Sequence, residues 1–352
     1  MDSIITYNHL IMNSYDGGKM EDYTLIRWER LDELGIEFSY IKSVVQKLYE
    51  YPIKENTIGE FRDNIKNYKD IDECQLLNLL EHETYKKASI FSIIQYKKNK
   101  DKIPIIEDVI NDVFYVYFKE KNDINFDDGE YYNGELDDCF KITYYSKNDN
   151  FVIIKMACVM NENSSETLDD GTTEEYDINL YDCCKFIIDI NKKLVIMFYN
   201  DIKSNIISIS KQITARKTAF RTLFNISNRN ILKYYLNSYL EKYFSEYMKE
   251  QRSGNPRKLV SIIEASAIDN NNQEKSLIRS IKRDYVHSEK RLDAIEDAVK
   301  NENLTISEIE CSLYDVIINL QMKGDISCIN SFLYEEVVEN VCKEFFNGYK
   351  SL

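Results

Sequence analysis

Apolar residues recur at helical spacing through the first hundred residues of the chain. Residues three or four positions apart share one face of a helix, so the pattern predicts helices whose apolar faces point to a core. Gly35 is expected to end a helix that contains Trp28, and a further helix is expected over residues 58–68. The two clearest apolar faces are formed by Ile41, Val44, Val45 and Leu48, and by Leu76, Leu77, Leu80, Ala88, Phe91 and Ile94.

After Pro104 the pattern changes to short runs of β-branched and aromatic residues, which favour strands. Turn residues separate several of these runs, and strands that follow one another in sequence usually lie side by side. The sequence therefore predicts a central antiparallel β-meander of about five strands, with helices covering one face. The expected strands are residues 113–119, 140–146, 151–160, 185–188 and 194–199.

From residue 206 onward the spacing again predicts helices. Thr305 and Glu308 have the spacing of a capping box, which predicts a helix start at this point, whereas residues 259–263 fit a short strand or a buried helix equally well. The overall prediction is an α+β protein with N-terminal helices, the central meander and a C-terminal helical bundle. Two domains are expected, residues 1–204 and 205–352. The helices of the bundle are predicted at residues 218–224, 231–248, 277–299, 306–322 and 332–346.

Charge is distributed unevenly along the chain. The formal net charge is −15, yet residues 205–291 contain 17 Lys and Arg against 8 Asp and Glu, a balance of +9 that leaves −24 for the remainder. Two acidic stretches, residues 123–138 and 162–177, are expected as solvated loops at the edge of the sheet. An acidic body with a basic segment can bind a polyanion through one surface and a basic partner through another.

The basic segment is the main candidate for binding. Basic side chains neutralise phosphates, and neighbouring aromatic rings such as Phe220 and Phe224 can stack on exposed bases. The alternative is that these residues form ordinary solvated helix faces. The predicted contacts with DNA or RNA are Lys211, Arg216, Lys217, Arg221, Arg229, Lys233, Arg252, Arg257, Lys258, Arg279, Lys282 and Arg283.

One short constellation suggests catalysis. If residues 182–203 form a hairpin, Asp182 and Asp201 lie on opposite arms with Lys203 two residues further on. Two carboxylates and a lysine can hold Mg²⁺ and activate water at a scissile phosphate. Over these 22 residues the arrangement resembles the core pattern of restriction-endonuclease-like nucleases, which implies a metal-dependent phosphodiester hydrolase. The alternative is a surface hairpin with ordinary charges.

Other signatures are missing from the sequence. There is no G-x-S-x-G, P-loop or G-x-G-x-x-G motif, the eight cysteines lack CxxC spacing, and the three histidines lack the spacing of a shared metal site. Neither a secretory signal nor an apolar run long enough for a membrane span is recognised, so a cytoplasmic protein is expected.

These observations together predict a non-enzymatic subunit that binds nucleic acid or a protein partner in a cytoplasmic complex. The AT-rich style of the composition suggests a setting of phage or mobile-element conflict, such as antiviral defence or counter-defence. No cofactor or metal is expected, apart from Mg²⁺ in the nuclease alternative. A second alternative is an acidic inhibitor or scaffold that binds protein.

Overall fold

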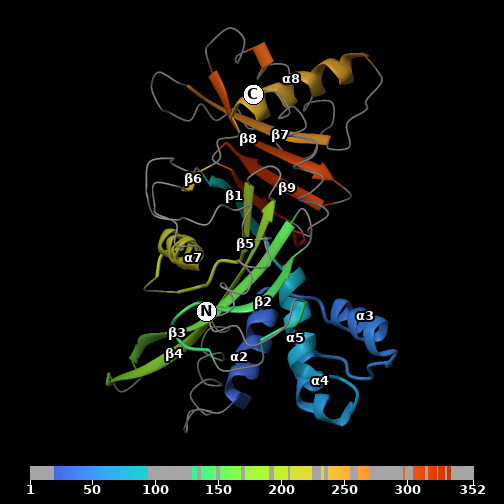
Figure 1. Ribbon diagram of the computed structural model, residues 1–352, viewed down its shortest axis with the longest axis vertical. Coiled ribbons are helices and arrows are strands. Elements are labelled where there is room, and N and C mark those ends of the chain that lie inside the picture. The colour runs from blue at the N-terminus through green and yellow to red at the C-terminus, as the bar shows by residue number, and fades with distance from the viewer. Residues whose placement is uncertain are drawn as a thin grey trace. The chain divides into compact units, whose positions relative to one another are not determined.

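The computed structural model divides the chain into two compact units (Figure 1). Unit 1 comprises Met1–Thr84, Lys100–Ile190 and Asn200–Ile226, and unit 2 comprises Tyr85–Asn99, Asn191–Tyr199 and Ser227–Leu352. The sequence predicts a single division after residue 204, whereas each of these units is assembled from separate stretches of chain. The residues described are 20–93, 129–132, 136–147, 151–167, 171–189, 194–204, 207–223, 231–233, 237–253, 261–269, 296–297, 304–313, 316–322, 324–329 and 331–333.

Unit 1 begins with the predicted N-terminal helices. Helix ends are fixed by local chemistry, because Thr57 Oγ1 accepts from Glu60 N at 3.2 Å, Asp72 Oδ1 accepts from Gln75 N at 3.0 Å, and Gly35 adopts a φ of 69°. The buried ring of Trp28 meets that of Phe61 edge-on, with 6.0 Å between centroids. The helices are α2 (Met20–Glu33), α3 (Phe38–Tyr49), α4 (Ile58–Asn64), the 3₁₀ turn η1 (Ile65–Asn67) and α5 (Glu73–Glu83).

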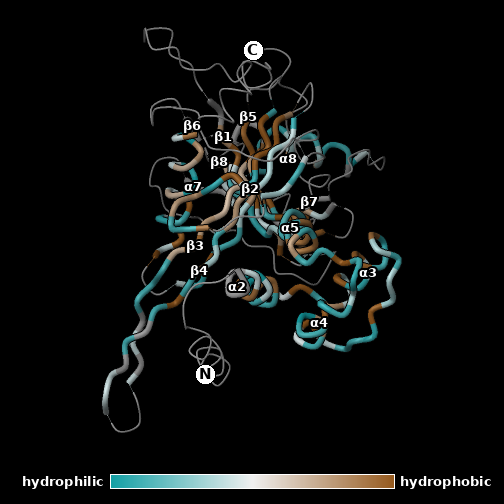
Figure 2. The backbone as a smooth tube through the Cα atoms, turned by 60° about the horizontal axis from the view of Figure 1, so that its bottom comes forward, coloured by the Kyte–Doolittle hydropathy of each residue, from teal (hydrophilic) through white to brown (hydrophobic). Residues whose placement is uncertain are grey.

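A three-stranded antiparallel sheet follows in unit 1, formed by β2 (Lys141–Lys147), β3 (Phe151–Thr167) and β4 (Thr173–Asp189). β3 and β4 pair over their whole length, from Phe151↔Asp189 to Thr167↔Thr173. Residues 162–177, predicted as a loop, are therefore mainly the continuation of these two strands. Figure 2 shows the far end of the pair as a predominantly hydrophilic arm. The final helix of the unit is α7 (Ile209–Leu223).

Unit 2 is built on antiparallel strands in the order β5-β1-β10-β9-β8-β7. β6 also pairs with β1, and α8 lies against β8. The predicted strand 194–199 is confirmed as β5, and within this unit it pairs with β1, with Lys87 opposite Tyr199. The elements are β1 (Lys87–Ile93), β5 (Leu194–Tyr199), β6 (Ile231–Lys233), α8 (Asn237–Ser253), β7 (Ser261–Asp269), β8 (Leu304–Leu313), β9 (Val316–Gln321) and β10 (Asp325–Cys328).

The predicted C-terminal helical bundle is wrong, because β8, β9 and β10 occupy much of the region assigned to it. Thr305 and Glu308 lie within β8 and cap no helix. The register shifts at this point, since Ala267 pairs with Ile306 and Ser266 with Glu308, leaving Ser307 as an extra residue. The bulge keeps Ile306 and Ile309 both buried although they are three positions apart, which imitates helical spacing.

A second error concerns the residues after α5. The helix ends at Glu83, and Ala88 and Phe91 belong to β1 of unit 2 instead of continuing the apolar face of Leu76 and Leu80. The central strands predicted at 140–146, 151–160 and 185–188 are confirmed within β2, β3 and β4. The strand expected at 113–119 and the helices expected at 277–299 and 332–346 lie largely outside the described residues.

Candidate functional site

Between α5 and α7 the sheet of unit 1 is buried on both faces, and each face contains a charged cluster. Successive side chains of a strand point to opposite faces. On β4, Tyr181 and Lys185 point toward α5, because the Tyr181 hydroxyl reaches Glu81 and Lys185 Nζ donates to the His82 carbonyl. Asp182 and Phe186 point the other way and meet Arg216 and Phe220 of α7. The sequence predicts helices on one face only, so the second layer is a finding of the structure.

The cluster beneath α5 is centred on the buried carboxylate of Glu81. Arg27 of α2 donates from Nε to Oε1 at 2.6 Å and from Nη2 to Oε2 at 3.0 Å. Lys155 Nζ and the Tyr181 hydroxyl donate to Oε2 at 2.6 and 2.9 Å. The second Arg27 amino group also holds Asn78 Oδ1 at 2.7 Å. Donors from α2, β3 and β4 thus converge on one side chain of α5.

These donors fix Glu81 in its charged form. Burial alone raises the pKa of a carboxyl group, but the charges of Arg27 and Lys155 and their hydrogen bonds outweigh burial and lower the pKa of Glu81 to about 2. A carboxylate with such a low pKa is a poor proton acceptor at neutral pH. The cluster is therefore suited to holding α2, α5 and the sheet together, and less suited to acid–base catalysis.

The cluster beneath α7 is a single ion pair. Arg216 Nε lies 3.0 Å from both carboxylate oxygens of Asp182, and Arg216 Nη2 lies 2.8 Å from Oδ1. The same Nη2 donates to the Asn200 carbonyl at 2.8 Å. Burial raises the pKa of Asp182, and the Arg216 charge and hydrogen bonds oppose that rise. Further contacts position α7: Gln212 bonds both backbone groups of Ile202, and Phe220 stacks on Phe186 at 4.6 Å.

The structure places the three residues of the predicted nuclease centre in different environments. Both oxygens of Asp182 are engaged by Arg216 in the interior, so Mg²⁺ would have to displace the guanidinium in order to bind there. The Asp201 carbonyl accepts from Arg30 Nη2 at 2.6 Å, and Lys203 is exposed. The arrangement does not present Asp182 to a substrate phosphate.

The thiols of β3 and β4 are also unsuited to nucleophilic chemistry. Burial raises the pKa of Cys183 to about 11, and burial raises the pKa of Cys158 and of Cys184 as well. The thiolate is the nucleophilic form, and these shifts keep the thiols protonated at neutral pH.

Helix α7 presents basic side chains on the face opposite the ion pair. A helix turns about 100° per residue, so Lys211, Lys217 and Arg221 fall within about 120° of one another. Gln212, Arg216, Phe220 and Leu223 form the buried side. Arg221 Nη2 donates to Thr218 Oγ1 at 2.7 Å, which holds the guanidinium along the helix. We call the six residues on the opposite side the outward face of α7: Ser210, Lys211, Thr214, Lys217, Thr218 and Arg221, all exposed or half-buried.

The other predicted nucleic-acid contacts are dispersed. Arg216 is 0% exposed and pairs with Asp182 in the interior. The three other basic residues of α7 are exposed or half-buried. In unit 2, Lys233 belongs to β6, and Arg252 of α8 is paired with Glu296 at 2.6 Å. The structure brings together only Lys211, Lys217 and Arg221 among the described members of the set. Outside the described residues lie Arg229, Arg257, Lys258, Arg279, Lys282 and Arg283.

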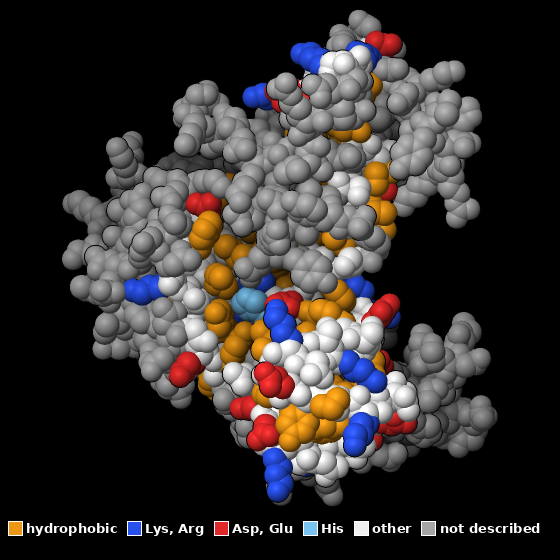
Figure 3. Space-filling model, turned by 90° about the vertical axis from the view of Figure 1, so that its right-hand side faces the viewer, with side chains coloured by type: hydrophobic (Ala, Val, Ile, Leu, Met, Phe, Trp, Pro, Cys, Tyr) orange, Lys and Arg blue, Asp and Glu red, His pale blue; other side chains and the backbone are white. Residues whose placement is uncertain are grey.

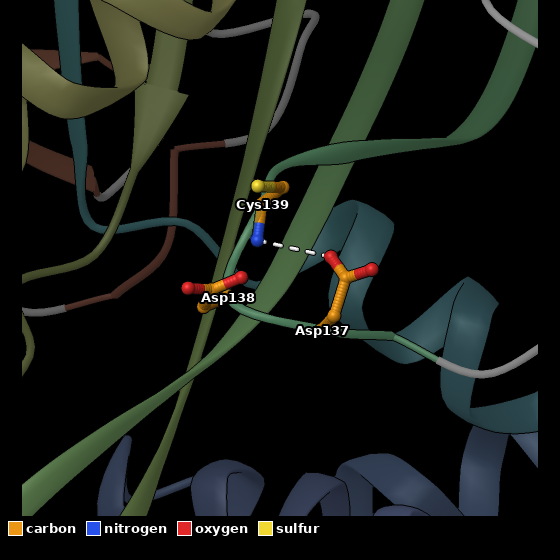
Figure 4. A group of neighbouring side chains, drawn as sticks. All are labelled: Asp137, Asp138 and Cys139. Carbon is orange, nitrogen blue, oxygen red and sulfur yellow. Dashed lines mark hydrogen bonds between the residues drawn. The ribbon is translucent and has the colours of Figure 1, made fainter.

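Asp137, Asp138 and Cys139 form a small exposed group whose possible ligand atoms lie within 4.8 Å of one another (Figure 4). Asp137 is already engaged, because its Oδ1 accepts from Cys139 N at 3.0 Å and its Oδ2 pairs with Lys141 Nζ at 2.9 Å. The negative charge of Asp138 raises the pKa of Cys139, which opposes formation of the thiolate that binds metals. Exposure and prior pairing make this group a weak metal ligand.

The Glu81 cluster was not predicted, although one signal was present. Lys155 and Lys185 interrupt the apolar runs FVIIKMACVM and CCKFIID, and a lysine inside a buried strand requires partners. Glu81 lies 54 residues from Arg27 and 74 residues from Lys155 in sequence, so spacing alone does not identify it as their common partner.

Exposed hydrophobic side chains are few among the described residues. Leu48 and Tyr51 are 50% and 36% exposed, and Figure 3 shows apolar side chains on the α3 and α4 side interspersed with acidic and basic ones.

No helix in the described ranges has the length and apolar character needed to cross a membrane. The chain matches no protein-family model and no curated protein.

Proposed function

We propose that this protein is a non-enzymatic nucleic-acid-binding subunit of a cytoplasmic complex, which holds the phosphate backbone on the outward face of α7. One observation carries the proposal: α7 buries one arginine against Asp182 and presents Lys211, Lys217 and Arg221 on the opposite side. The helix contains no Asp or Glu. Lys, Arg and hydroxyl side chains are the groups that contact phosphates in protein–nucleic acid complexes.

The ion pair supports this role by fixing the orientation of the helix. Because Arg216, Gln212 and Phe220 each contact the sheet or the segment that precedes α7, rotation of the helix about its axis would break all three contacts. The basic face is therefore preorganised, which reduces the conformational entropy lost on binding. The acidic remainder of the chain repels polyanions and restricts contact to this face.

Binding through a few cations is expected to be weak, salt-dependent and insensitive to sequence. Three neutralised phosphates correspond to a slope of about −2.7 in a plot of log K against log salt for duplex DNA. Base readout is not expected, because Lys and Arg contacts to the backbone carry no sequence information. The ion pair of Asp182 with Arg216 argues against the nuclease alternative, because both carboxylate oxygens are already engaged.

The test is fluorescence anisotropy of the full chain with single- and double-stranded DNA and RNA over a range of salt. The variant Lys211→Glu/Lys217→Glu/Arg221→Glu is expected to weaken binding roughly 100-fold and to flatten the salt slope. A matched control reverses three exposed lysines of the helical region, Lys47→Glu/Lys54→Glu/Lys69→Glu, and is expected to bind much more tightly than the α7 variant. Failure of the wild type to bind any of the four nucleic acids, or equal loss in both variants, would overturn the proposal.

A further inference from the structure

The far end of the β3–β4 pair forms an exposed acidic surface in unit 1. β2 covers β3 as far as Ala157, and Val159 N then donates to the Asp137 carbonyl at 2.8 Å. Beyond this point the two strands continue as a pair on their own. We call residues 161–167 of β3 and 173–178 of β4 the acidic ribbon (Figures 1 and 2).

One face of the acidic ribbon is exposed and polar along its length. The strand face that packs on α5 near Tyr181 continues outward, because side chains two positions apart share a face. On this continuation the ribbon presents amide, hydroxyl and carboxylate groups only. The exposed residues are Asn161, Asn163, Ser165, Thr167, Thr173, Glu175 and Asp177.

The charge of the ribbon is entirely negative. The acidic ribbon contains five Asp and Glu and no Lys or Arg, and its exposed face carries Glu175 and Asp177. An isolated two-stranded pair is itself only marginally stable. A cationic surface docked on the exposed face of the ribbon would therefore stabilise the pair.

A surface of complementary charge exists on the same unit. The outward face of α7 has three basic side chains and no carboxylate. If the ribbon of each molecule lies on α7 of the other, the two contacts are equivalent, as in a closed two-fold dimer.

We propose that two copies of this chain associate through the acidic ribbon of each copy and the outward face of α7 of the other. The contact is electrostatic, so its strength falls as salt rises. A dimer of this kind covers the face that we assign to nucleic acid, so self-association and nucleic-acid binding compete. Self-association itself is independent of that function and is measured without nucleic acid.

The experiment is sedimentation velocity of the full chain at low and high ionic strength, with a charge-swapped pair of variants. Variant one carries Glu175→Lys/Asp177→Lys in the ribbon, and variant two carries Lys217→Glu/Arg221→Glu in α7. Each variant alone places like charges in the contact and is expected to weaken dimerisation at least about tenfold. An equimolar mixture is expected to restore the dimer, because each ribbon then faces an α7 of opposite charge.

A control with Glu37→Lys/Asp70→Lys, two exposed acids of the helical region, is expected to dimerise like the wild type at low salt. A wild type that stays monomeric at low salt overturns the proposal, and so does a dimer that survives in either variant. A mixture that associates no better than its components shows that the two surfaces do not meet. Loss of nucleic-acid binding in the α7 variant with an unchanged dimer would contradict this proposal and leave the proposed function standing.

Discussion

The two faces of the unit 1 sheet bury carboxylates whose pKa values are shifted in opposite directions. Under α5, Glu81 has a pKa lowered to about 2. Under α7, Asp182 has a raised pKa, although it is held by three short contacts to Arg216. Both side chains are buried, and burial acts on both in the same direction. The difference must therefore come from their partners.

The number of cations and donors explains the difference. Glu81 receives Arg27, Lys155 and the Tyr181 hydroxyl, so two positive charges and several hydrogen bonds overcome the cost of burial. Asp182 receives one arginine, whose Nη2 is shared with the Asn200 carbonyl. One cation opposes the effect of burial without reversing it.

Packing under α5 depends on the buried charges, whereas packing under α7 is compatible with its buried charges and does not depend on them. Under α5 the described residues place Arg27 and Lys155 around the carboxylate of Glu81, so removing that carboxylate leaves uncompensated positive charge. Under α7 the charges are balanced one to one. The first arrangement holds three elements together, whereas the second orients one helix and leaves its other cations on the surface.

The largest expected effect is that of Glu81→Gln. The substitution leaves Arg27 and Lys155 buried without a counter-charge, and we expect it to lower the free energy of unfolding by about 3–5 kcal/mol. Urea unfolding followed by the fluorescence of Trp28, the single tryptophan and a buried residue of α2, reports on unit 1. Asp70→Asn, at an exposed position, is the matched control and is expected to change little. A cost below about 1 kcal/mol for Glu81→Gln would show that the cluster does not depend on its carboxylate.

Lowering the pH is expected to have a slightly smaller effect on the free energy of unfolding, through the protonation of Glu81. The folded-state pKa of Glu81, about 2, lies below the ordinary value of 4.5, so its contribution is fully present above pH 4.5 and is lost as pH falls toward 2. A shift of this size corresponds to about 3 kcal/mol. Asp182 has the opposite sign, because its raised pKa means that the folded state takes up a proton more readily than the unfolded state.

The measurement is the difference in unfolding free energy between the wild type and Glu81→Gln, followed by Trp28 fluorescence at a series of pH values. The difference is expected to shrink as pH falls below about 4.5, since protonation removes the charge that the variant lacks. A difference that stays constant down to about pH 3 would contradict the assignment of the low pKa to Glu81.

The helices of unit 1 could be predicted because local chemistry specifies them. The apolar spacing of Ile41 and Val45, the glycine at 35 and the side-chain cap at Asp72 all act within a few residues. Strand β8 of unit 2 could not be predicted in the same way, because the bulge at Ser307 gives it the apolar spacing of a helix. Local pattern has no information about which strand lies opposite.

The candidate site shows the same difference between what local sequence specifies and what depends on distant residues. The basic character of α7 is visible in the sequence, but the sequence does not show that Arg216 points inward, because this depends on Asp182 on β4, 34 residues earlier. For the same reason Asp182 resembled a metal ligand. An acid that a hairpin presents and an acid that a hairpin buries have the same local sequence, and only the packing of α7 distinguishes them.

The smallest expected effect is that of removing both charges under α7. Arg216→Met alone leaves a buried carboxylate and is expected to destabilise unit 1, whereas Asp182→Leu/Arg216→Met replaces a balanced pair by apolar side chains. Such replacements are often neutral or stabilising, so we expect the double variant to unfold within about 2 kcal/mol of the wild type. Thermal unfolding of the two single variants and the double variant measures the coupling between the residues.

The outward face of α7 is untouched, so a stable double variant that still binds nucleic acid would show that Phe220 and Gln212 suffice to orient the helix. A stable double variant that loses binding would show that the ion pair sets the rotation of α7, and a double variant less stable than both single variants would contradict the distinction between the two faces.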